Sequence, residues 1–340
     1  MKICLVNASN PITSNGNDGY FDFRDYHSWE DAKWRSWHSI PAALQTEFFA
    51  YNGENFHRVY EYDGVILLAN HQPQLLIPFV KKLKTMGKIV VVGYHEGFGD
   101  FMWAAQNNSF VKNFKALVNE ADAYWNVIPS AANVFMSLFR KVIVNSLHAV
   151  PLEEWQHEFT KPPEEREGIF IASRSIEQRL SRNHIAAVAI ADLAAHMLGT
   201  YATYVTEEEV PPIMKNFTRV QIIKGPLSYV NWLELMSRHK IVFHYDNSHT
   251  LGQPVMDALL VDLPCIGGNS ENNVESETAF HLRGIENLIV EFYNEPDILP
   301  IFKQKMTFSY LKQHVLSIFQ ALMGSNLNIG ELMDESTILN

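Results

Sequence analysis

Cysteine is scarce in this chain of 340 residues, which holds only Cys4 and Cys265. Both lie in apolar, strand-like runs, so a disulfide framework is not expected and a reducing compartment is the default. Basic charge is also in short supply, because 27 Lys and Arg stand against 38 Asp and Glu, for a net charge of −11. A general nucleic-acid-binding protein normally has a basic excess, so the charge argues against that class and leaves room only for a local basic groove.

Long hydrophobic runs are missing as well. No apolar stretch reaches the roughly 18 residues of a membrane span. The chain opens with the letters MKICLV, which are typical of a strand and not of a signal peptide. Hydrophobic residues make up 47% of the chain and charged residues 19%, as in packed globular proteins. We therefore expect a soluble cytoplasmic protein without an integral membrane segment, long enough for two domains.

Several chemical motifs are absent too, including HExxH, a close Cys/His cluster, a P-loop and GxSxG. The 14 histidines include His244 and His249, five positions apart in an expected loop, with Asp246 between them. These three residues could form a metal site. The interpretation we favour is that they line a ligand pocket.

Apolar strands alternate with helices along most of the chain, which predicts parallel sheets with helices on both faces. The patterns indicate strands at 2–6, 64–69, 88–94, 123–128, 141–145, 168–172, 201–206, 220–224, 241–243, 265–268 and 287–293. They indicate helices at 39–49, 78–86, 110–121, 131–139, 184–198, 229–238, 250–260 and 300–322.

A charged, proline-rich stretch at 151–167 interrupts this alternation. We interpret residues 156–167 as a linker between an N-terminal domain, 1–155, and a C-terminal domain, 168–325. The predicted fold class is α/β, with two Rossmann-like domains facing each other across a cleft. The last helix is placed so that it is able to pack back on the N-terminal domain.

An aromatic segment at 20–37 contains Tyr26, Trp29, Trp34 and Trp37. It is either a core-facing helix with Trp anchors or a lip that stacks on a substrate.

The stretch from 240 to 268 shows a strand, a polar loop, a helix and a second strand. Pro254 falls in the first turn of the helix, where a missing N–H costs little. Gly252 would allow a phosphate to approach the backbone closely. Ligands of open α/β sheets bind at the carboxyl ends of strands, often against a helix N-terminus, so we expect a ligand site here.

The letters HTLGQPVMDALLVDLPCI in this stretch resemble the signature E-x-F-G-x-P-x-x-E-A-x-A-x-G-x-P-V-I. That signature belongs to retaining glycosyltransferases of the GT-B fold, the glycogen-synthase-like group. Matches fall at Gly252, Pro254, Ala258, Pro264 and Ile266. The departures are His249 at the first Glu, which contacts the donor sugar in the family, Asp257 at the second Glu, which holds the ribose, and Asp262 at a common Gly.

Two arginines extend the resemblance. The family places an Arg after the first strand of its second domain and a Lys five positions on, and Arg174 and Arg179 have that spacing. The resemblance implies that they clamp the diphosphate, whose charge grows as it leaves. Arg182 is a less well spaced alternative, and each Arg could instead form a surface ion pair.

His95 follows the strand at 88–94 and precedes a glycine-rich stretch, Gly97-Phe98-Gly99, which we expect to be a loop. Many members of the family carry a His here that faces the donor sugar. A purely structural His is the other interpretation. Glu96 and Asp100 lie close enough in sequence to orient His95 or to serve an acceptor hydroxyl.

The resemblance implies a glycosyltransferase that moves a sugar from a nucleotide-diphosphate sugar to an acceptor hydroxyl, with retention and without a metal. No D-x-D pair of the metal-dependent type occurs. The implied site contains His95, Arg174 and Arg179 as catalytic residues, and the donor-binding residues Asp246, His249, Leu251, Gly252 and Asp257. The nucleotide sugar is the co-substrate, no other cofactor is expected, and the acceptor is a glycan, lipid, protein or modified DNA base. Two alternatives stay open: an inactive nucleotide-binding protein of this fold, and a DNA-modifying glucosyltransferase of phage type.

Overall fold

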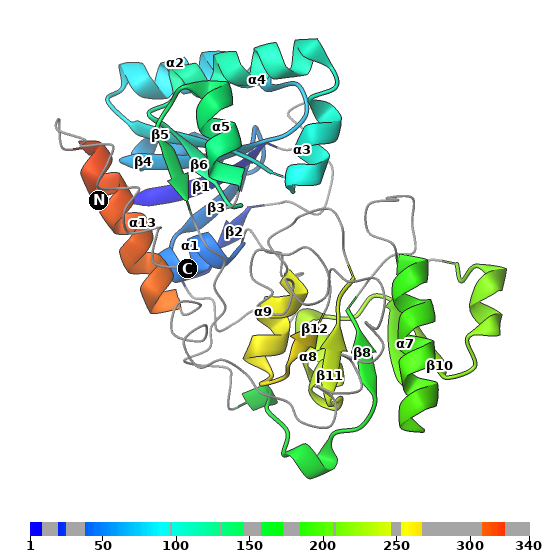
Figure 1. Ribbon diagram of the computed structural model, residues 1–340. Helices are drawn as coiled ribbons and strands as arrows, with labels where there is room; N and C mark the ends of the chain where they lie inside the picture. The colour runs from blue at the N-terminus through cyan, green and yellow to red at the C-terminus, as the bar shows by residue number, and fades with distance from the viewer. Residues whose placement is uncertain are drawn as a thin grey trace. The chain divides into compact units, whose positions relative to one another are not determined.

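The computed structural model forms two compact units (Figure 1). Unit 1 comprises Met1–Ser28, Arg35–Ala149 and Phe308–Asn340, and unit 2 comprises Trp29–Trp34 and Val150–Thr307. The structure describes residues 1–8, 20–24, 38–95, 97–128, 131–145, 158–172, 184–206, 209–245, 253–266 and 308–323.

Unit 1 is built on a sheet whose described strands have the order β2-β3-β1-β4-β5-β6-β7. β2 runs antiparallel to β3, and the other neighbouring pairs are parallel. The order of the parallel strands switches between β1 and β4, as in doubly wound folds. The strands are β1 (Ile3–Ala8), β2 (Phe21–Asp22), β3 (Glu47–Ala50), β4 (Gly64–Ala69), β5 (Ile89–Tyr94), β6 (Ala123–Asn126) and β7 (Ile143–Asn145).

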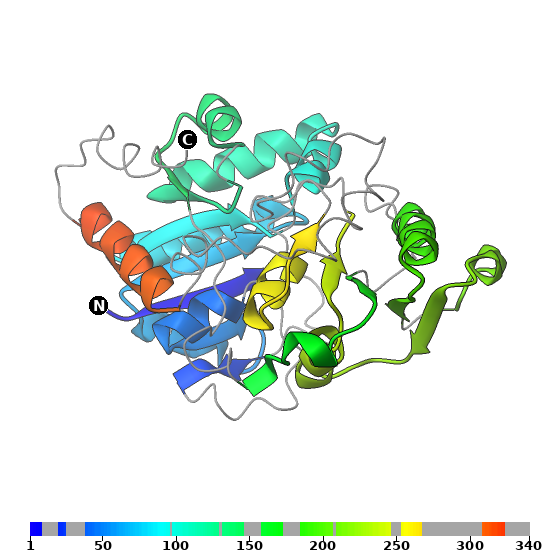
Figure 2. The same ribbon diagram turned by 60° about the horizontal axis from the view of Figure 1, so that its bottom comes forward.

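Helices cover both faces of this sheet (Figures 1 and 2). Tyr94 of β5 packs edge-on against Phe114 of α4, whereas Gly64 of β4 lies under Phe319 of α13 on the opposite face. The helices are α1 (Ser39–Leu44), α2 (Ile77–Thr85), α3 (Phe98–Ala104), α4 (Asn108–Glu120), α5 (Ala132–Phe139) and α13 (Phe308–Met323), with 3₁₀ turns η3 (Phe56–Glu61) and η4 (Pro73–Leu76).

Unit 2 has a parallel sheet whose described strands follow the order β10-β9-β8-β11-β12. Numbered along the chain this is 3-2-1-4-5, the Rossmann order, with its switch point between β8 and β11. The strands are β8 (Ile169–Ile171), β9 (Ala202–Thr206), β10 (Val220–Lys224), β11 (Ile241–Phe243) and β12 (Cys265–Ile266). The helices are α7 (His184–Leu198), α8 (Tyr229–Ser237) and α9 (Gln253–Leu260), with 3₁₀ turns η6 (Pro163–Glu165) and η8 (Pro212–Asn216).

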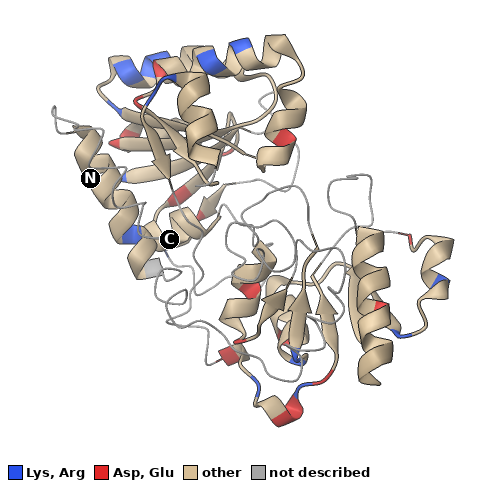
Figure 3. Ribbon diagram, in the orientation of Figure 1, with Lys and Arg blue, Asp and Glu red and all other residues tan. Residues whose placement is uncertain are grey.

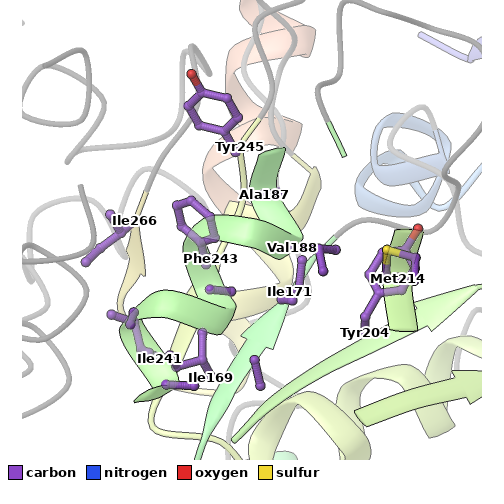
Figure 4. Close-up of a cluster of buried hydrophobic side chains, with 14 residues drawn as sticks. Ile169, Ile171, Ala187, Val188, Tyr204, Met214, Ile241, Phe243, Tyr245 and Ile266 are labelled. Atoms are coloured by element: carbon purple, nitrogen blue, oxygen red, sulfur yellow. The ribbon is translucent and has the colours of Figure 1, made fainter. Parts of the chain in front are cut away.

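The core of unit 2 shows why α7 is rich in alanine. Ala187 and Val188 of α7 and Ile169, Ile171 and Phe243 of the central strands belong to one buried cluster (Figure 4). Small side chains let the helix approach the sheet closely, while the larger strand residues fill the space between them. On the opposite face, the rings of Phe170 in β8 and Trp232 in α8 meet edge-on, with centroids 4.8 Å apart.

The two Rossmann-like units confirm the predicted α/β fold class, but two local predictions were wrong. The helix expected at 39–49 ends at Leu44, because Gln45 adopts φ 51° and its N–H bonds back to Ala42. The chain then enters β3. The glycine-rich loop expected after His95 is instead helical from Phe98. The aromatic residues 26–37 and the expected strand at 287–293 lie outside the described residues.

Within the described residues, no helix has both the length and the apolar character needed to cross a membrane.

Candidate functional site

The carboxyl ends of β8 and β11 meet at the switch point of unit 2. Ala172, just after β8, donates its N–H to Phe243 O at 2.9 Å. His244, just after β11, is 5% exposed, and its Nδ1 lies 3.1 Å from Ala172 O. Since a carbonyl only accepts, Nδ1 carries the proton in this contact. His244 therefore fixes the two strand ends relative to each other.

In the sequence, residues 173–183 follow β8 and residues 246–252 follow β11. Six of the predicted site residues belong to these segments and lie outside the described residues: Arg174, Arg179, Asp246, His249, Leu251 and Gly252. Their positions in the chain show that they follow the two strands between which ligands bind in open α/β sheets. Their roles stay predictions.

Asp257 is described, and it is buried within α9 at 1% exposure. Its Oδ1 accepts hydrogen bonds from Tyr229 Oη at 2.8 Å and from Gln253 Nε2 at 2.7 Å. Its Oδ2 accepts one from Trp232 Nε1 at 3.0 Å. A buried carboxylate is tolerated when donors surround it in this way. These contacts join α8 to the first turns of α9, so Asp257 has a structural task whether or not it also holds a ribose.

Sequence reasoning missed Tyr229 and Trp232 as partners of this carboxylate. Both come from the first turn of α8, about 25 positions away. The available signal was an acidic residue on the buried side of an apolar helix, which requires donors from some neighbouring element.

Asp262 stands where the signature has a common Gly. It adopts a left-handed φ of 59°, two residues after the end of α9. Asp262 N bonds to Leu259 O at 3.2 Å, and Leu263 N bonds to Ala258 O at 2.8 Å. This pair of bonds is the Schellman motif, which requires a left-handed residue and favours Gly or Asn. Asp262 O also accepts from Arg166 Nη1 at 2.8 Å, which anchors the end of α9.

Burial shifts the pKa values of two titratable side chains near these helices, His239 and Cys265. Burial lowers the pKa of His239 to about 4, and its Nδ1 and Nε2 bond to Leu235 O and Thr203 Oγ1. Burial, with an added contribution from Asp257, raises the pKa of the Cys265 thiol well above its usual value.

In unit 1, His95 continues from β5 at the carboxyl edge of the sheet and is half-buried. Its N–H bonds to Ala69 O at 2.9 Å, so the parallel ladder extends one residue beyond the strand. Two residues later Gly97, with extended backbone, precedes the first turn of α3, which contains Asp100. A carboxylate in that position is favoured by the helix dipole.

A close packing contact supports this edge. A Cβ added to Gly93 would lie 2.9 Å from Trp125 O and 3.2 Å from Trp125 Cβ, so only glycine fits there. Trp125 is fully buried, and in the described part of the chain its indole N–H has no hydrogen-bond acceptor. This contact fixes the distance between β5 and β6 just before His95.

Among the described residues, no group of three or more His, Cys, Asp and Glu side chains is arranged to hold a metal ion.

The fold is similar to that of solved GT-B glycosyltransferases. HepE of Anabaena, solved in complex with UDP, aligns with a TM-score of 0.56 and 12% identity over 94% of this chain and 100% of its own. A glycosyltransferase from Rickettsia africae aligns with a TM-score of 0.57 and 11% identity over 96% of this chain and 99% of its own.

An alpha-glucosyltransferase in complex with UDP aligns with a TM-score of 0.57 and 12% identity, over 95% of this chain and 100% of its own. An alpha-glucosyltransferase has also been solved with UDP and a 13-mer DNA containing an HMU base. These alignments show that the chain has the GT-B fold. No family model and no curated protein sequence matches it.

Proposed function

We propose that this protein is a glycosyltransferase that takes its sugar from a nucleotide-diphosphate donor bound by unit 2. One observation carries the proposal: the two segments that follow β8 and β11, the strands at the switch point, contain the predicted donor-binding residues. The fold shared with UDP-bound transferases supports it.

In this proposal Arg174 and Arg179 bind the diphosphate and stabilise the charge that grows as the glycosidic bond breaks, a task that needs no metal. Gly252, before α9, lets the diphosphate approach the backbone and the positive end of the helix dipole. Asp246, His249 and Leu251 surround the sugar and nucleotide. Asp257 holds α8 against α9, and its predicted contact with the ribose is part of the proposal.

His95 belongs to the acceptor half of the proposed enzyme. It stands at the carboxyl edge of the sheet in unit 1, and a half-buried imidazole is able to hydrogen-bond a sugar or acceptor hydroxyl. The acceptor is a hydroxyl of a glycan, lipid, protein or modified DNA base.

The test is a titration of the whole chain with UDP, followed by thermal unfolding. UDP should raise the midpoint temperature, because a ligand that binds only the folded state stabilises it. Arg174→Ala should weaken UDP binding about tenfold or more, since it removes a charge-assisted hydrogen bond. Arg238→Ala, which changes an exposed Arg of unit 2, is the matched control and should keep the affinity. No response to UDP or to any other nucleotide or nucleotide sugar would overturn the proposal.

Turnover separates the enzyme from an inactive binding protein. A panel of nucleotide sugars should show slow hydrolysis of one donor, and transfer when the right acceptor is present. Nucleotide binding without hydrolysis or transfer would favour the inactive alternative.

Modified DNA, already among the acceptors expected from the sequence, gains support from the DNA-bound alpha-glucosyltransferase with this fold. The described basic residues on α2 and α4 give this acceptor limited support (Figure 3). Lys81 is paired with Glu120 at 3.3 Å and Lys84 with Asp122 at 2.6 Å, so part of this charge is already neutralised. A gel assay with a 13-mer duplex containing an HMU base decides whether DNA is glucosylated.

A further inference from the structure

A cavity of about 330 Å³ opens in unit 1 at the amino edge of the sheet. Ile3 begins β1, Glu47 begins β3, and Tyr62 precedes β4. The carboxyl edge that holds His95 lies at the other end of these strands, about 20 Å away for a six-residue strand. Its charged lining consists of Lys2, Arg24, Glu47, Arg58, Glu61 and Lys312.

The wall of this cavity contains one buried carboxylate, Glu47, whose side chain is 1% exposed. It accepts hydrogen bonds from the hydroxyls of Tyr20 and Tyr62. Its Oε1 lies 2.5 Å from Arg58 Nη1. The negative charge of Glu47 is thus compensated inside the wall, and the same contacts fix Arg58 and Tyr62 in place.

Two guanidinium groups gather at this wall. Arg24 Nη2 lies 3.7 Å from the same Glu47 oxygen that Arg58 contacts, so the two arginines are neighbours. Arg24 is held in turn by Asp22, through Nε at 2.7 Å and through Nη2. Within the described part of the chain, these bonds use Nη1 of Arg58 and Nε and Nη2 of Arg24. Arg58 Nε also lies 3.9 Å from Glu61 Oε2, so within the described residues the N–H groups left for an anion are on Nη2 of Arg58 and Nη1 of Arg24.

Lys2 and Lys312 bring the cationic residues of the lining to four. Three carboxylates stand against them: Glu47 and Glu61 in the lining, and Asp22, which pairs with Arg24. This excess is local, because the chain as a whole has a net charge of −11. Figure 3 shows the charged segments of this region, acidic on β2 and β3 and basic on α13. Neighbouring cations that are already held in position favour a ligand with more than one negative charge.

We propose that this cavity is a second binding site, which takes a small molecule that carries a phosphate group. The phosphate contacts Arg24, Arg58 and the lysines at the rim. Ile3, Leu44, Leu316 and the ring of Tyr62 receive the uncharged part of the ligand. The volume is at the lower end of the range for small-molecule pockets, which suits a phosphorylated sugar or a ligand of similar size. The proposal does not depend on the transferase activity.

Binding at this site has a consequence for α13, because Lys312 and Leu316 come from that helix while the other lining residues come from residues 1–62. α13 is also the element with which the chain re-enters unit 1 after the whole of unit 2. A ligand that contacts both sides of the cavity stabilises the packing of α13 against the first residues of β1 and β3.

The experiment is isothermal titration of the full chain with inorganic phosphate and with ribose 5-phosphate, and with ribose as the uncharged control. Both phosphates should bind and ribose should not. Arg24→Gln and Lys312→Gln should each weaken ribose 5-phosphate binding about tenfold, the loss expected for one charge-assisted hydrogen bond. Amide hydrogen exchange in α13 should slow when the ligand is bound.

Lys81→Gln is the matched control. Lys81 and Arg24 are both ion-paired, and their side chains are 58% and 55% exposed, but Lys81 does not line the cavity. The titrations with ribose 5-phosphate are repeated in excess UDP, so that phosphate bound at the proposed donor site is excluded. Lys81→Gln should bind ribose 5-phosphate like the unchanged chain, and circular dichroism checks that every variant is folded. Absence of binding by both phosphates, or equal weakening by Lys81→Gln, overturns the proposal.

Discussion

Two carboxylates, Asp257 in unit 2 and Glu47 in unit 1, are each 1% exposed. Each accepts hydrogen bonds from two aromatic side chains, Tyr229 and Trp232 for Asp257, and two tyrosines for Glu47. An unpaired charge in such a place would be costly, so the donors make these acids possible. At the scale of single residues, each of these two acids joins its own element to another part of the chain through aromatic donors.

Asp257→Asn should lower the free energy of unfolding of unit 2 by about 2 kcal/mol, because the new amide group turns a donor toward a site built from donors. Urea unfolding followed by tryptophan fluorescence measures this. Glu234→Gln, on the exposed side of α8, is the matched control and should have almost no effect.

The same variant distinguishes the two roles of Asp257. Unchanged stability together with a large loss of UDP affinity would contradict the structural role and assign the carboxylate to the nucleotide.

Asp262 illustrates what sequence alone could and could not show at this scale. The resemblance identified it as a residue in place of a glycine. The structure supplies the reason, a left-handed φ of 59° that Asp adopts at moderate cost. The partners of Asp257 could not be predicted, because only the packing of α8 on α9 brings them together.

At the scale of elements, the strands were the most predictable part. β1, β4 and β5 are buried along almost their whole length, so their sequences are continuous apolar runs. The errors came at junctions between elements. Gln45 ends α1 in a left-handed conformation, which is uncommon for Gln and so could not be predicted from the residue type. Gly99 lies inside α3, where a helix forms despite a residue that disfavours it.

α13 is tied to unit 1 by packing that a single added methyl group should disturb. A Cβ at Gly64 would lie 2.4 Å from Cε1 of Phe319, which is fully buried, so a side chain or the backbone must shift. Gly64→Ala should therefore lower the free energy of unfolding of unit 1 by about 1–3 kcal/mol, as overpacked cores do. Thermal or urea unfolding measures the loss.

The smaller side chain in Phe319→Leu provides the control. Gly64→Ala should cost much less in that background, because the clash is removed and the two changes are coupled. Equal costs in both backgrounds would show that Phe319 is not the residue that Gly64 accommodates.

At the scale of the whole molecule, the sequence predicted two Rossmann-like units because each contains its own alternation of strands and helices. The resemblance also predicts a donor site in unit 2, from signature residues that follow β8 and β11, and that site stays a prediction. The cavity of unit 1 could not be predicted. Its lining comes from five separated parts of the chain, whose overall charge is acidic, so no local pattern marks it.

The two thiols allow the units to be followed separately, because Cys4 lies in β1 of unit 1 and Cys265 in β12 of unit 2. Burial raises the pKa of each thiol, so the native chain presents almost no reactive thiolate. Both should react with a thiol reagent at pH 8 at least about a hundredfold more slowly in the native chain than in urea.

Cys4→Ala and Cys265→Ala each leave one reporter. The urea dependence of labelling in each variant should follow the unfolding of the unit that keeps its thiol. Rapid labelling of either thiol in the native chain would contradict the burial that the structure shows.

The return of the chain to unit 1 through α13 also sets an order of events during synthesis. β1 to β7 leave the ribosome first, but Leu311, Val315, Ile318 and Phe319, all buried in unit 1, are made only after every residue of unit 2. Unit 2 is continuous from 150 to 307 apart from a short early segment, so its residues are complete before those of unit 1. Unit 1 is therefore the first unit to begin synthesis and the last to be completed. Until α13 is made, the face of the sheet that it covers in the folded protein stays uncovered.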